Sequence, residues 1–373
     1  MSKKVNILFS DFEYFPPKGG GTISVRALFK YLQDDKIETG VRFNCEAIYC
    51  GIQRDPEVTS YPVRLPHLRG YWINIFFLNR LWIKILLEHL RNKKYDILLT
   101  QNHFIPATVK VGELLKIPVV VFIRGFDFMN FFHFYKRRFI DPRFFMQFPF
   151  YLAARRWFVA ALERASVIIA NSEFTQKRIE KILGKSVEVI YPFIDFEECT
   201  SQQSKNREFI TMFFPHIHKG GEIVLKIAER LQEKKFLVIG NGDAKIITKL
   251  KRLPNVTYLP FTDNVKEAYA RTRILLVPSI IEESFGRVII EARLNNIPVI
   301  GSNKGNIPNA IGKAGSIIYD FGNIDAWVEE IKRYDDDEYL KSKVRFAQLS
   351  LQKYRLEIQA KKFKEVIFNL LKK

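Results

Sequence analysis

The stretch PSIIEESFGRVIIEARLNNIPVIGSNKGNIP, residues 278–308, indicates the fold class of this chain. Its pattern predicts a buried strand that ends near Ser279, a polar loop, a helix from about Gly286 and a further strand at 298–301. Strand, helix and strand in so short a stretch are typical of a parallel sheet.

The same alternation runs along most of the chain, with short apolar runs bounded by Gly, Pro and Asn. Such β-branched runs between helices imply parallel sheets that are covered on both faces. We expect strands at 5–10, 41–50, 95–100, 117–123 and 166–171, and a second series at 209–214, 236–240, 256–259, 274–279, 298–301 and 316–319.

A polar stretch separates the two series, and 373 residues are too many for one ordinary core. We therefore expect an α/β protein with two Rossmann-like domains that face each other across a deep cleft. The predicted boundaries are 1–190 for the first domain, 191–208 for the linker and 209–354 for the second domain, with a helix at about 355–373 that packs back on the first. Ligands of open α/β sheets bind beyond the carboxyl ends of the strands, which here would face the cleft.

The net charge of +19 is unevenly distributed. Residues 61–160 contain 16 Lys and Arg against five Asp and Glu, and 23 of the 52 aromatic residues. Basic and aromatic residues interleaved at 68–94 and 131–158 favour contact with an anionic membrane surface. A solvated basic face over an aromatic core remains the alternative. No nucleic-acid-binding motif is found, so nucleic acid is not expected as a partner.

The chain begins with a strand pattern and not with an export signal, and no apolar run is long enough to span a membrane. The longest candidate, 71–94, is interrupted by Asn74, Arg80 and Lys84. Three cysteines without metal-like spacing indicate reduced thiols. We expect a cytoplasmic protein, with peripheral association at the inner face of the membrane as the membrane hypothesis implies.

Two carboxylates eight residues apart, Glu283 and Glu291, are the first candidates for chemistry. A loop carboxylate at a strand's end can accept hydrogen bonds from sugar hydroxyls, and a carboxylate in the helix can hold a ribose diol. The helix N-terminus between them offers N–H groups to a diphosphate. The plain alternative is that Glu283 is a helix-terminal charge and Glu291 a surface residue.

The full stretch resembles the signature of the group 1 (family 4) retaining glycosyltransferases: Pro-Ser, Glu-x-Phe-Gly, Glu-Ala, Pro-Val-Ile and a glycine-rich turn. Further segments look like other motifs of that family. They are the predicted glycine loop KGGGT (18–22), ASVIIANSEFTQKRI (165–179), the domain-crossing strand VEVIYPFID (187–195) and KGG (219–221). The resemblance implies the GT-B fold, with an acceptor-binding first domain and a second domain that binds a nucleotide-sugar.

The resemblance also implies roles for single residues. Glu291 is expected to bind the nucleotide ribose and Glu283 the hydroxyls of the transferred sugar. Lys219 is expected to neutralise the donor diphosphate. The remaining expected donor-binding positions are Gly20 and Gly21 in the phosphate pocket, Ser284, Phe285 and Gly286 at the helix start, Arg287, and Gly240 in the glycine turn GNGD (240–243).

The chain departs from the family pattern at two places. Arg124 stands where a His is expected after the IPVV strand; a guanidinium cannot act as a base, but it can hold phosphate, sugar or acceptor. An Arg usually found before the KG lysine is replaced by Phe213, with His216 and His218 nearer. Arg287 is a compensating cation in one interpretation and a solvated helix residue in the other.

The resemblance implies transfer of a sugar from a nucleotide-sugar to a glycan or lipid-linked acceptor, with retention at the anomeric carbon. It implies no cofactor and no obligatory metal, and a place in cell-surface polysaccharide or glycolipid synthesis. Two alternatives remain: a non-catalytic, membrane-associated binding protein of the same fold, and a nucleotide-sugar epimerase or a phosphorylase on the same scaffold. The acidic run at 335–337 is interpreted as solvated helix capping and not as a metal site.

Overall fold

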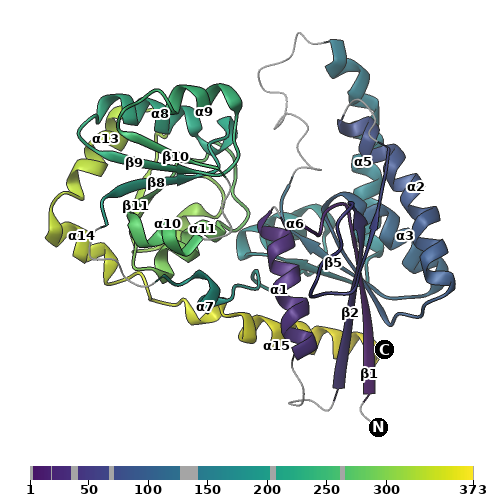
Figure 1. The fold of residues 1–373 in the computed structure, drawn as a ribbon. Coiled ribbons are helices and arrows are strands. Elements are labelled where there is room, and N and C mark those ends of the chain that lie inside the picture. The colour runs from purple at the N-terminus through teal and green to yellow at the C-terminus, as the bar shows by residue number, and fades with distance from the viewer. Residues whose placement is uncertain are drawn as a thin grey trace. The chain divides into compact units, whose positions relative to one another are not determined.

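The computed structural model describes residues 3–17, 19–34, 41–66, 71–126, 142–201, 207–260 and 265–372. The chain divides into two compact units, each with its own sheet (Figure 1). Unit 1 comprises Met1–Ile194 and Leu356–Lys373, and unit 2 comprises Asp195–Arg355. Two parallel-sheet units separated along the chain confirm the predicted fold class.

The sheet of unit 1 has seven parallel strands in the order β3-β2-β1-β4-β5-β6-β7. The five strands predicted in this part of the chain are all present. β3 was not predicted because it has only four residues and contains Pro62, which an edge strand tolerates. The strands are β1 (Lys3–Asp11), β2 (Val41–Cys50), β3 (Ser60–Val63), β4 (Ile97–Gln101), β5 (Val119–Ile123), β6 (Val167–Ala170) and β7 (Glu188–Val189).

Helices cover both faces of this sheet, because successive strand residues point to opposite sides. On β1, Ile7 and Phe9 join the core cluster that includes α1 and α15, whereas Leu8 joins the cluster formed with α2, α3 and α5. The helices are α1 (Gly20–Asp34), α2 (Tyr71–Arg91), α3 (Ile105–Leu115), α5 (Pro142–Arg164), α6 (Glu173–Leu183) and α15 (Leu356–Leu371), with a 3-10 turn η1 (Asn102–Phe104).

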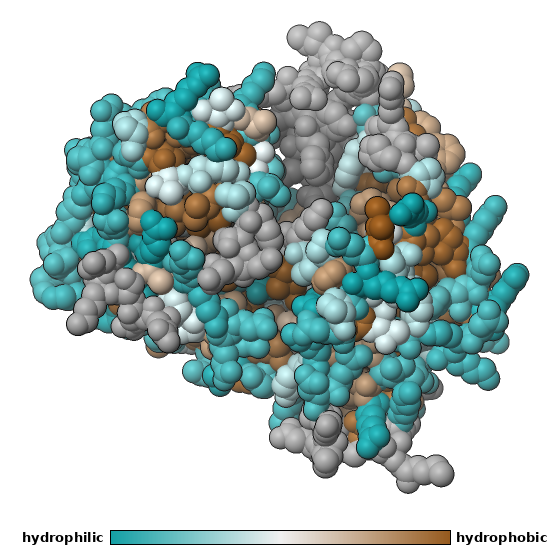
Figure 2. All heavy atoms as spheres, viewed as in Figure 1, coloured by the Kyte–Doolittle hydropathy of each residue, from teal (hydrophilic) through white to brown (hydrophobic). Residues whose placement is uncertain are grey.

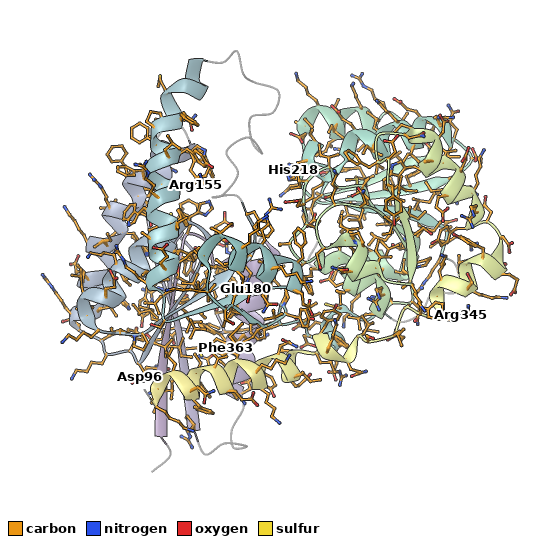
Figure 3. All side chains as sticks on the ribbon, turned by 180° about the vertical axis from the view of Figure 1, so that it is seen from behind. Asp96, Arg155, Glu180, His218, Arg345 and Phe363 are labelled. Carbon is orange, nitrogen blue, oxygen red and sulfur yellow. The ribbon has the colours of Figure 1, made fainter. Side chains whose placement is uncertain are left out.

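Helix α15 belongs to unit 1 although it follows unit 2 in the sequence. The ring of Phe363 stacks on Phe122 of β5, with 5.9 Å between centroids, on the side of α15 that faces the sheet (Figure 3). Gln359 Oε1 accepts a hydrogen bond of 2.9 Å from the backbone N–H of Tyr191. The helix therefore completes the core of the sheet from the far end of the chain.

The sheet of unit 2 has six parallel strands in the order β10-β9-β8-β11-β12-β13, and all six were predicted. They are β8 (Phe209–Phe213), β9 (Lys235–Ile239), β10 (Val256–Leu259), β11 (Thr272–Val277), β12 (Val299–Ser302) and β13 (Gly315–Ile318). The helices are α7 (Phe196–Cys199), α8 (Gly221–Arg230), α9 (Ala244–Leu250), α10 (Val265–Arg271), α11 (Arg287–Leu294), α12 (Ile307–Ile311), α13 (Ile324–Arg333) and α14 (Asp337–Val344), with 3-10 turns η3 (Ile217–Lys219) and η4 (Gln352–Tyr354).

The predicted glycine loop at 18–22 is wrong at residues 20–22, because α1 already begins at Gly20. The N–H of Ile23 donates to the carbonyl of Gly19 at 3.0 Å, which closes the first helical turn. The hydroxyl of Thr22 also donates to that carbonyl, at 2.8 Å. Gly20 and Gly21 therefore lie in the first turn of a helix, and Lys18 lies outside the described residues.

Two smaller predictions are confirmed. Cys45, Cys50 and Cys199 are free thiols. In the acidic run, Asp336 caps α14, since its Oδ1 accepts from the backbone N–H of Glu338 at 2.8 Å.

Within the described residues, no helix combines the length and the apolar character needed to cross a membrane.

The close contact between β12 and β13 generates a stability prediction. A Cβ on Gly315 would lie 1.9 Å from the carbonyl oxygen of Val299, its partner in the sheet register. Because backbone atoms must move to admit it, we expect Gly315→Ala to lower the free energy of unfolding by about 1–3 kcal/mol. Urea unfolding measures this. Gly322→Ala is the control, since its Cβ would be 3.6 Å from Asp320 Oδ1; equal effects of the two changes would contradict the argument.

Candidate functional site

The turn between β11 and α11 requires a glycine. Gly286 precedes the helix with φ at +85°, in the left-handed region that glycine favours. A Cβ there would also lie 2.9 Å from Cδ1 of Ile289. Gly286 thus lets the chain leave the loop of Glu283 and enter α11 directly.

The loop before α11 is held from both sides. Asn306 donates from Nδ2 to the carbonyl of Phe285 at 2.9 Å, and the buried Phe285 ring meets Tyr354 edge-on. The first N–H groups of any α-helix lack acceptors within the helix, and its dipole is positive there. Residues 284–287 therefore lie at the positive end of α11 beside the loop, and their contact with a diphosphate stays a prediction.

Glu283 is fixed through its side chain and its backbone. Its Oε1 accepts hydrogen bonds from Lys219 Nζ and, at 2.9 Å, from Ser279 Oγ. Its carbonyl accepts from the N–H of Asn306 at 2.7 Å, beside a parallel bridge to Gly305. The structure therefore brings together Lys219 and Glu283, which lie 64 residues apart in the sequence.

The carboxylate of Glu283 is kept ionised. Burial alone would raise the pKa of Glu283, but the charge of Lys219 and the hydrogen bonds from Lys219 and Ser279 lower that pKa below its ordinary value of 4.5. At neutral pH this group is a hydrogen-bond acceptor on both oxygens.

Lys219 reaches Glu283 because two backbones approach closely at Gly220. Lys219 ends the 3-10 turn η3, and Gly220 follows with φ at +86°. A Cβ on Gly220 would lie 2.1 Å from the carbonyl oxygen of Pro278. The N–H of Ile280 donates to the carbonyl of His218 at 3.1 Å, which ties η3 to the end of β11.

Two histidines lie in the same turn as Lys219. The rings of His216 and His218 stack with 5.0 Å between centroids, and Figure 3 labels His218. Asp243 lies beside them: its Oδ2 is 3.8 Å from Nδ1 of His216 and accepts from the N–H of Ile217 at 2.6 Å. His218 also helps, as a smaller influence than Lys219, to lower the pKa of Glu283.

Gly240 follows β9 with φ at +95°. A Cβ there would meet the ring of Phe214 at 2.8 Å, and Tyr258 donates from its hydroxyl to the Gly240 carbonyl at 3.1 Å. These described contacts of Gly240 do not include Lys219 or Glu283.

Glu291 is buried on α11, so the interpretation as a surface residue is wrong. Its Oε1 accepts from Nε of Arg287 at 2.5 Å, and its Oε2 accepts from the hydroxyl of Tyr269 at 2.7 Å. The side chain of Arg287 is 18% exposed and forms an ion pair with Glu291, which also rules out a purely solvated helix residue at that position.

The other predicted site residues lie in unit 1, where Arg124 directly follows β5 and Gly20 and Gly21 lie in the first turn of α1. A Cβ on Gly21 would lie 3.4 Å from the amide of Gln101 and 3.5 Å from Cγ of Arg124. Nε of Arg124 donates to Oε1 of Gln101 at 3.2 Å, and its guanidinium lies over the ring of Phe122. Unit 1 therefore places an arginine charge beside the first turn of α1, which also holds Gly20.

Two family profiles match the chain. Residues 18–198 match Glycosyltransferase Family 4, and residues 209–337 match Glycosyl transferases group 1. The chain belongs to the group 1 glycosyltransferases of family 4. The matched segments contain every predicted site residue, and the two parallel sheets match the GT-B fold.

Curated proteins resemble this glycosyltransferase in sequence over part of its length. The N-acetyl-alpha-D-glucosaminyl L-malate synthase of Bacillus anthracis is 28% identical over 171 residues, which are 40% of this chain and 45% of that protein. Aligned segments thus span slightly less than half the length of the first curated relatives.

Two solved structures are similar over nearly the whole chain. Anabaena HepE in complex with UDP and glucose has a TM-score of 0.75 at 17% identity, covering 98% of this chain and 100% of HepE. WaaG, a glycosyltransferase involved in lipopolysaccharide biosynthesis, has a TM-score of 0.71 at 14% identity, covering 97% and 99%. At these identities the likeness shows the fold alone.

Sequence reasoning missed several residues that touch the predicted ones. Ser279 was assigned to the strand end without a role, and Asn306 lay in the glycine-rich turn. Gln101 and Tyr269 gave no signal, because a polar residue after a strand and an aromatic residue in a helix are both common. Only the folded arrangement brings them to Arg124 and Glu291.

The lowered pKa of Glu283 generates a pH prediction. Ionised Glu283 stabilises the fold above its unfolded pKa of about 4.5, and this contribution is lost as the pH falls through the lower folded pKa. Denaturant unfolding at a series of pH values should therefore show a shallower acid loss of stability for Glu283→Gln than for the wild-type protein. Glu282→Gln, at an exposed neighbouring position, is the matched control. The same pH dependence in both variants would contradict the prediction.

Proposed function

We propose that the chain transfers a sugar from a nucleotide-sugar donor to a glycan or lipid-linked acceptor, with retention at the anomeric carbon. The observation that carries the proposal is the Lys219–Glu283 ion pair at the end of β11, next to the N-terminus of α11. A cation, an ionised acceptor and the positive end of a helix dipole at one strand end suit a sugar diphosphate.

The hard step is departure of the nucleoside diphosphate, which gains negative charge as the sugar becomes oxocarbenium-like. Lys219 and the positive end of α11 would stabilise that charge. Glu283, ionised and held by Ser279, would accept hydrogen bonds from the sugar hydroxyls. Glu291 would accept them from the ribose.

The departing phosphate would accept the proton of the acceptor hydroxyl on the same face of the sugar as the attack. The new glycosidic bond then has the configuration of the bond that breaks, and no side-chain nucleophile is needed. Because Lys219 and the helix dipole supply positive charge, we propose that the reaction needs no metal and no cofactor.

The similar proteins support a donor of this kind. HepE was solved with UDP and glucose, and WaaG takes part in lipopolysaccharide biosynthesis. We therefore propose cell-surface polysaccharide or glycolipid synthesis as the setting.

Donor turnover tests the proposal. The protein is incubated with UDP-, GDP- and ADP-sugars, with and without membrane extract, and nucleoside diphosphate release is measured. We expect release from one donor, stimulated by extract and retained in EDTA. Removal of a hydrogen bond to a charged group costs about 1.5–3 kcal/mol, so Glu283→Ala and Glu291→Ala should each lower kcat/KM at least about tenfold.

Glu282→Ala, an exposed carboxylate one residue from Glu283, is the control and should keep full activity. NMR of the product reports the anomeric configuration, and inversion would contradict retention. Loss of activity in EDTA that Mg²⁺ restores would contradict metal independence. Nucleotide binding without turnover under any acceptor would favour the non-catalytic binding protein, and conversion of the donor sugar without acceptor would favour an epimerase.

We further propose that unit 1 contacts an anionic membrane through α2 and α5, which pack together. Both helices expose hydrophobic and basic side chains, and brown atoms gather over this part of unit 1 in Figure 2. Arg155 on α5 is labelled in Figure 3. The residues are Phe77, Arg80 and Lys84 on α2, and Met146, Phe148, Leu152, Arg155 and Arg156 on α5.

The charge of this surface matches an anionic lipid headgroup, and its aromatic residues suit the interfacial region of a bilayer. On α2, the guanidinium of Arg80 lies 4.7 Å from the ring centroid of Phe76, so charge and aromatic surface are adjacent. The segment 131–141, also expected to contribute, lies outside the described residues.

Vesicle sedimentation tests the membrane proposal, with phosphatidylcholine vesicles that contain or lack phosphatidylserine. Each basic residue near an anionic surface contributes about 1 kcal/mol, so Arg155→Glu with Arg156→Glu should weaken binding at least about tenfold. Lys249→Glu with Arg252→Glu, an equal charge change at exposed positions of unit 2, should have little effect. No binding to anionic vesicles at low salt would contradict the proposal.

A further inference from the structure

Each oxygen of the Glu291 carboxylate accepts a strong hydrogen bond from a different side chain. Tyr269 of α10 donates its hydroxyl proton to Oε2 at 2.7 Å, and Arg287, one turn earlier on α11, donates from Nε to Oε1 at 2.5 Å. A carboxylate that receives one donor on each oxygen from two different helices has its plane and its direction fixed.

Helix α11 around Glu291 is also hydrogen-bonded to the first residues of unit 2, on and just after α7. The thiol of Cys199, on α7, lies 3.8 Å from Oε1 of Glu291. Asn295, at the end of α11, donates to the Cys199 carbonyl at 2.9 Å and accepts from the N–H and the hydroxyl of Ser201, each at 2.7 Å. Helix α11 therefore has little freedom to rotate Glu291 away.

Charge and burial agree with a positioning role. The side chain of Glu291 is 8% exposed and that of Arg287 18%, so the arginine offsets the cost of burying the carboxylate. Burial first, and then the charge of Glu291, raise the pKa of Tyr269 well above its ordinary value, so its hydroxyl keeps the proton that it donates.

Each carboxylate oxygen has two acceptor positions. Among the described residues, Tyr269 and Arg287 each occupy one position with a strong donor, and the thiol of Cys199 is only a weak competitor at Oε1. The second position on each oxygen can then accept from a bound ligand. Two acceptor positions on one rigid carboxylate match the two hydroxyls of a vicinal diol, as in a ribose.

We propose that Tyr269 and Arg287 are positioning residues that hold Glu291 for the 2′- and 3′-hydroxyls of the donor's ribose, and so make the site selective for ribonucleotides. The inference rests on the proposed function, because it takes a ribonucleoside diphosphate as the leaving group. It adds the residues that fix the selectivity, which Glu291 alone does not.

Unit 2 contains a matched control with the same three residue types. Tyr339 donates to Oε1 of Glu330 at 2.7 Å, and Arg333 donates to Oε2 of Glu330 at 3.0 Å. This group lies on α13 and α14 and not on α10 and α11. Tyr339→Phe therefore removes an equivalent hydroxyl from an equivalent carboxylate elsewhere in the same unit.

Calorimetric binding of UDP, GDP and ADP, and of their 2′,3′-dideoxy counterparts, tests the proposal in wild-type, Tyr269→Phe, Arg287→Lys and Tyr339→Phe proteins. We expect the wild-type protein to bind one ribonucleotide more tightly than its dideoxy counterpart. Tyr269→Phe and Arg287→Lys should weaken ribonucleotide binding about tenfold with little change for the dideoxy form. Tyr339→Phe should change neither.

The outcomes separate a positioning role from a structural one. If Tyr269→Phe and Arg287→Lys weaken both nucleotide forms equally, or only lower the unfolding temperature, the residues support the fold and the inference is overturned. The same follows if both variants keep wild-type selectivity, or if the wild-type protein does not distinguish the two forms. A wild-type protein that binds no nucleotide contradicts the proposed function itself, and the inference falls with it.

Discussion

The cost of taking a carboxylate out of water governs the site in unit 2. Glu283 and Glu291 are both largely withdrawn from solvent, and an isolated buried carboxylate would take up a proton. One of its oxygens would then donate a hydrogen bond instead of accepting one. Each carboxylate accepts hydrogen bonds from one cation and one hydroxyl. Glu283 accepts from Lys219 and Ser279. Glu291 accepts from Arg287 and Tyr269. Two charged acceptors are thereby kept on either side of the start of α11.

The Lys219–Glu283 pair forms where backbone segments pass each other at very short range. Gly220, Gly286 and Gly305 all have positive φ, and a Cβ on Gly305 would lie 2.4 Å from the carbonyl oxygen of Glu283. Side chains at these positions would push apart the turn that carries Lys219, the loop that carries Glu283 and the turn after β12. Glycines thus set the spacing, and the charged groups then set the chemistry.

Much of the fold follows from local pattern. Strands such as 41–50 and 256–259 were predicted with their observed bounds. Short apolar runs between turn residues are typical of the buried strands of a parallel sheet. The edge strand β3 escaped prediction, since four residues around a proline resemble a loop. The glycines at 20 and 21 were expected in a loop, whereas the bond from Ile23 to Gly19 draws them into a helix.

The site was predictable where a motif spans a single strand end, as for Glu283 and Gly286. It was not predictable where the partner comes from another element. Tyr269 looks like any apolar residue of an amphipathic helix, and Ser279 like any residue at the end of a strand; only the packing of α10 and α11 and the turn of Lys219 assign them to a carboxylate. Long-range hydrogen bonds of this kind have no local signature.

Helix α15 gives the chain an unusual order of assembly. Unit 2 is continuous in sequence, whereas the core of unit 1 lacks the ring of Phe363 until residues 356–371 exist. During synthesis on the ribosome, the strands of unit 1 emerge first, but α15 covers their sheet last. Phe122 and Phe193 cannot contact Phe363 until all of unit 2 has been made. The first domain to be translated is thus the last to mature.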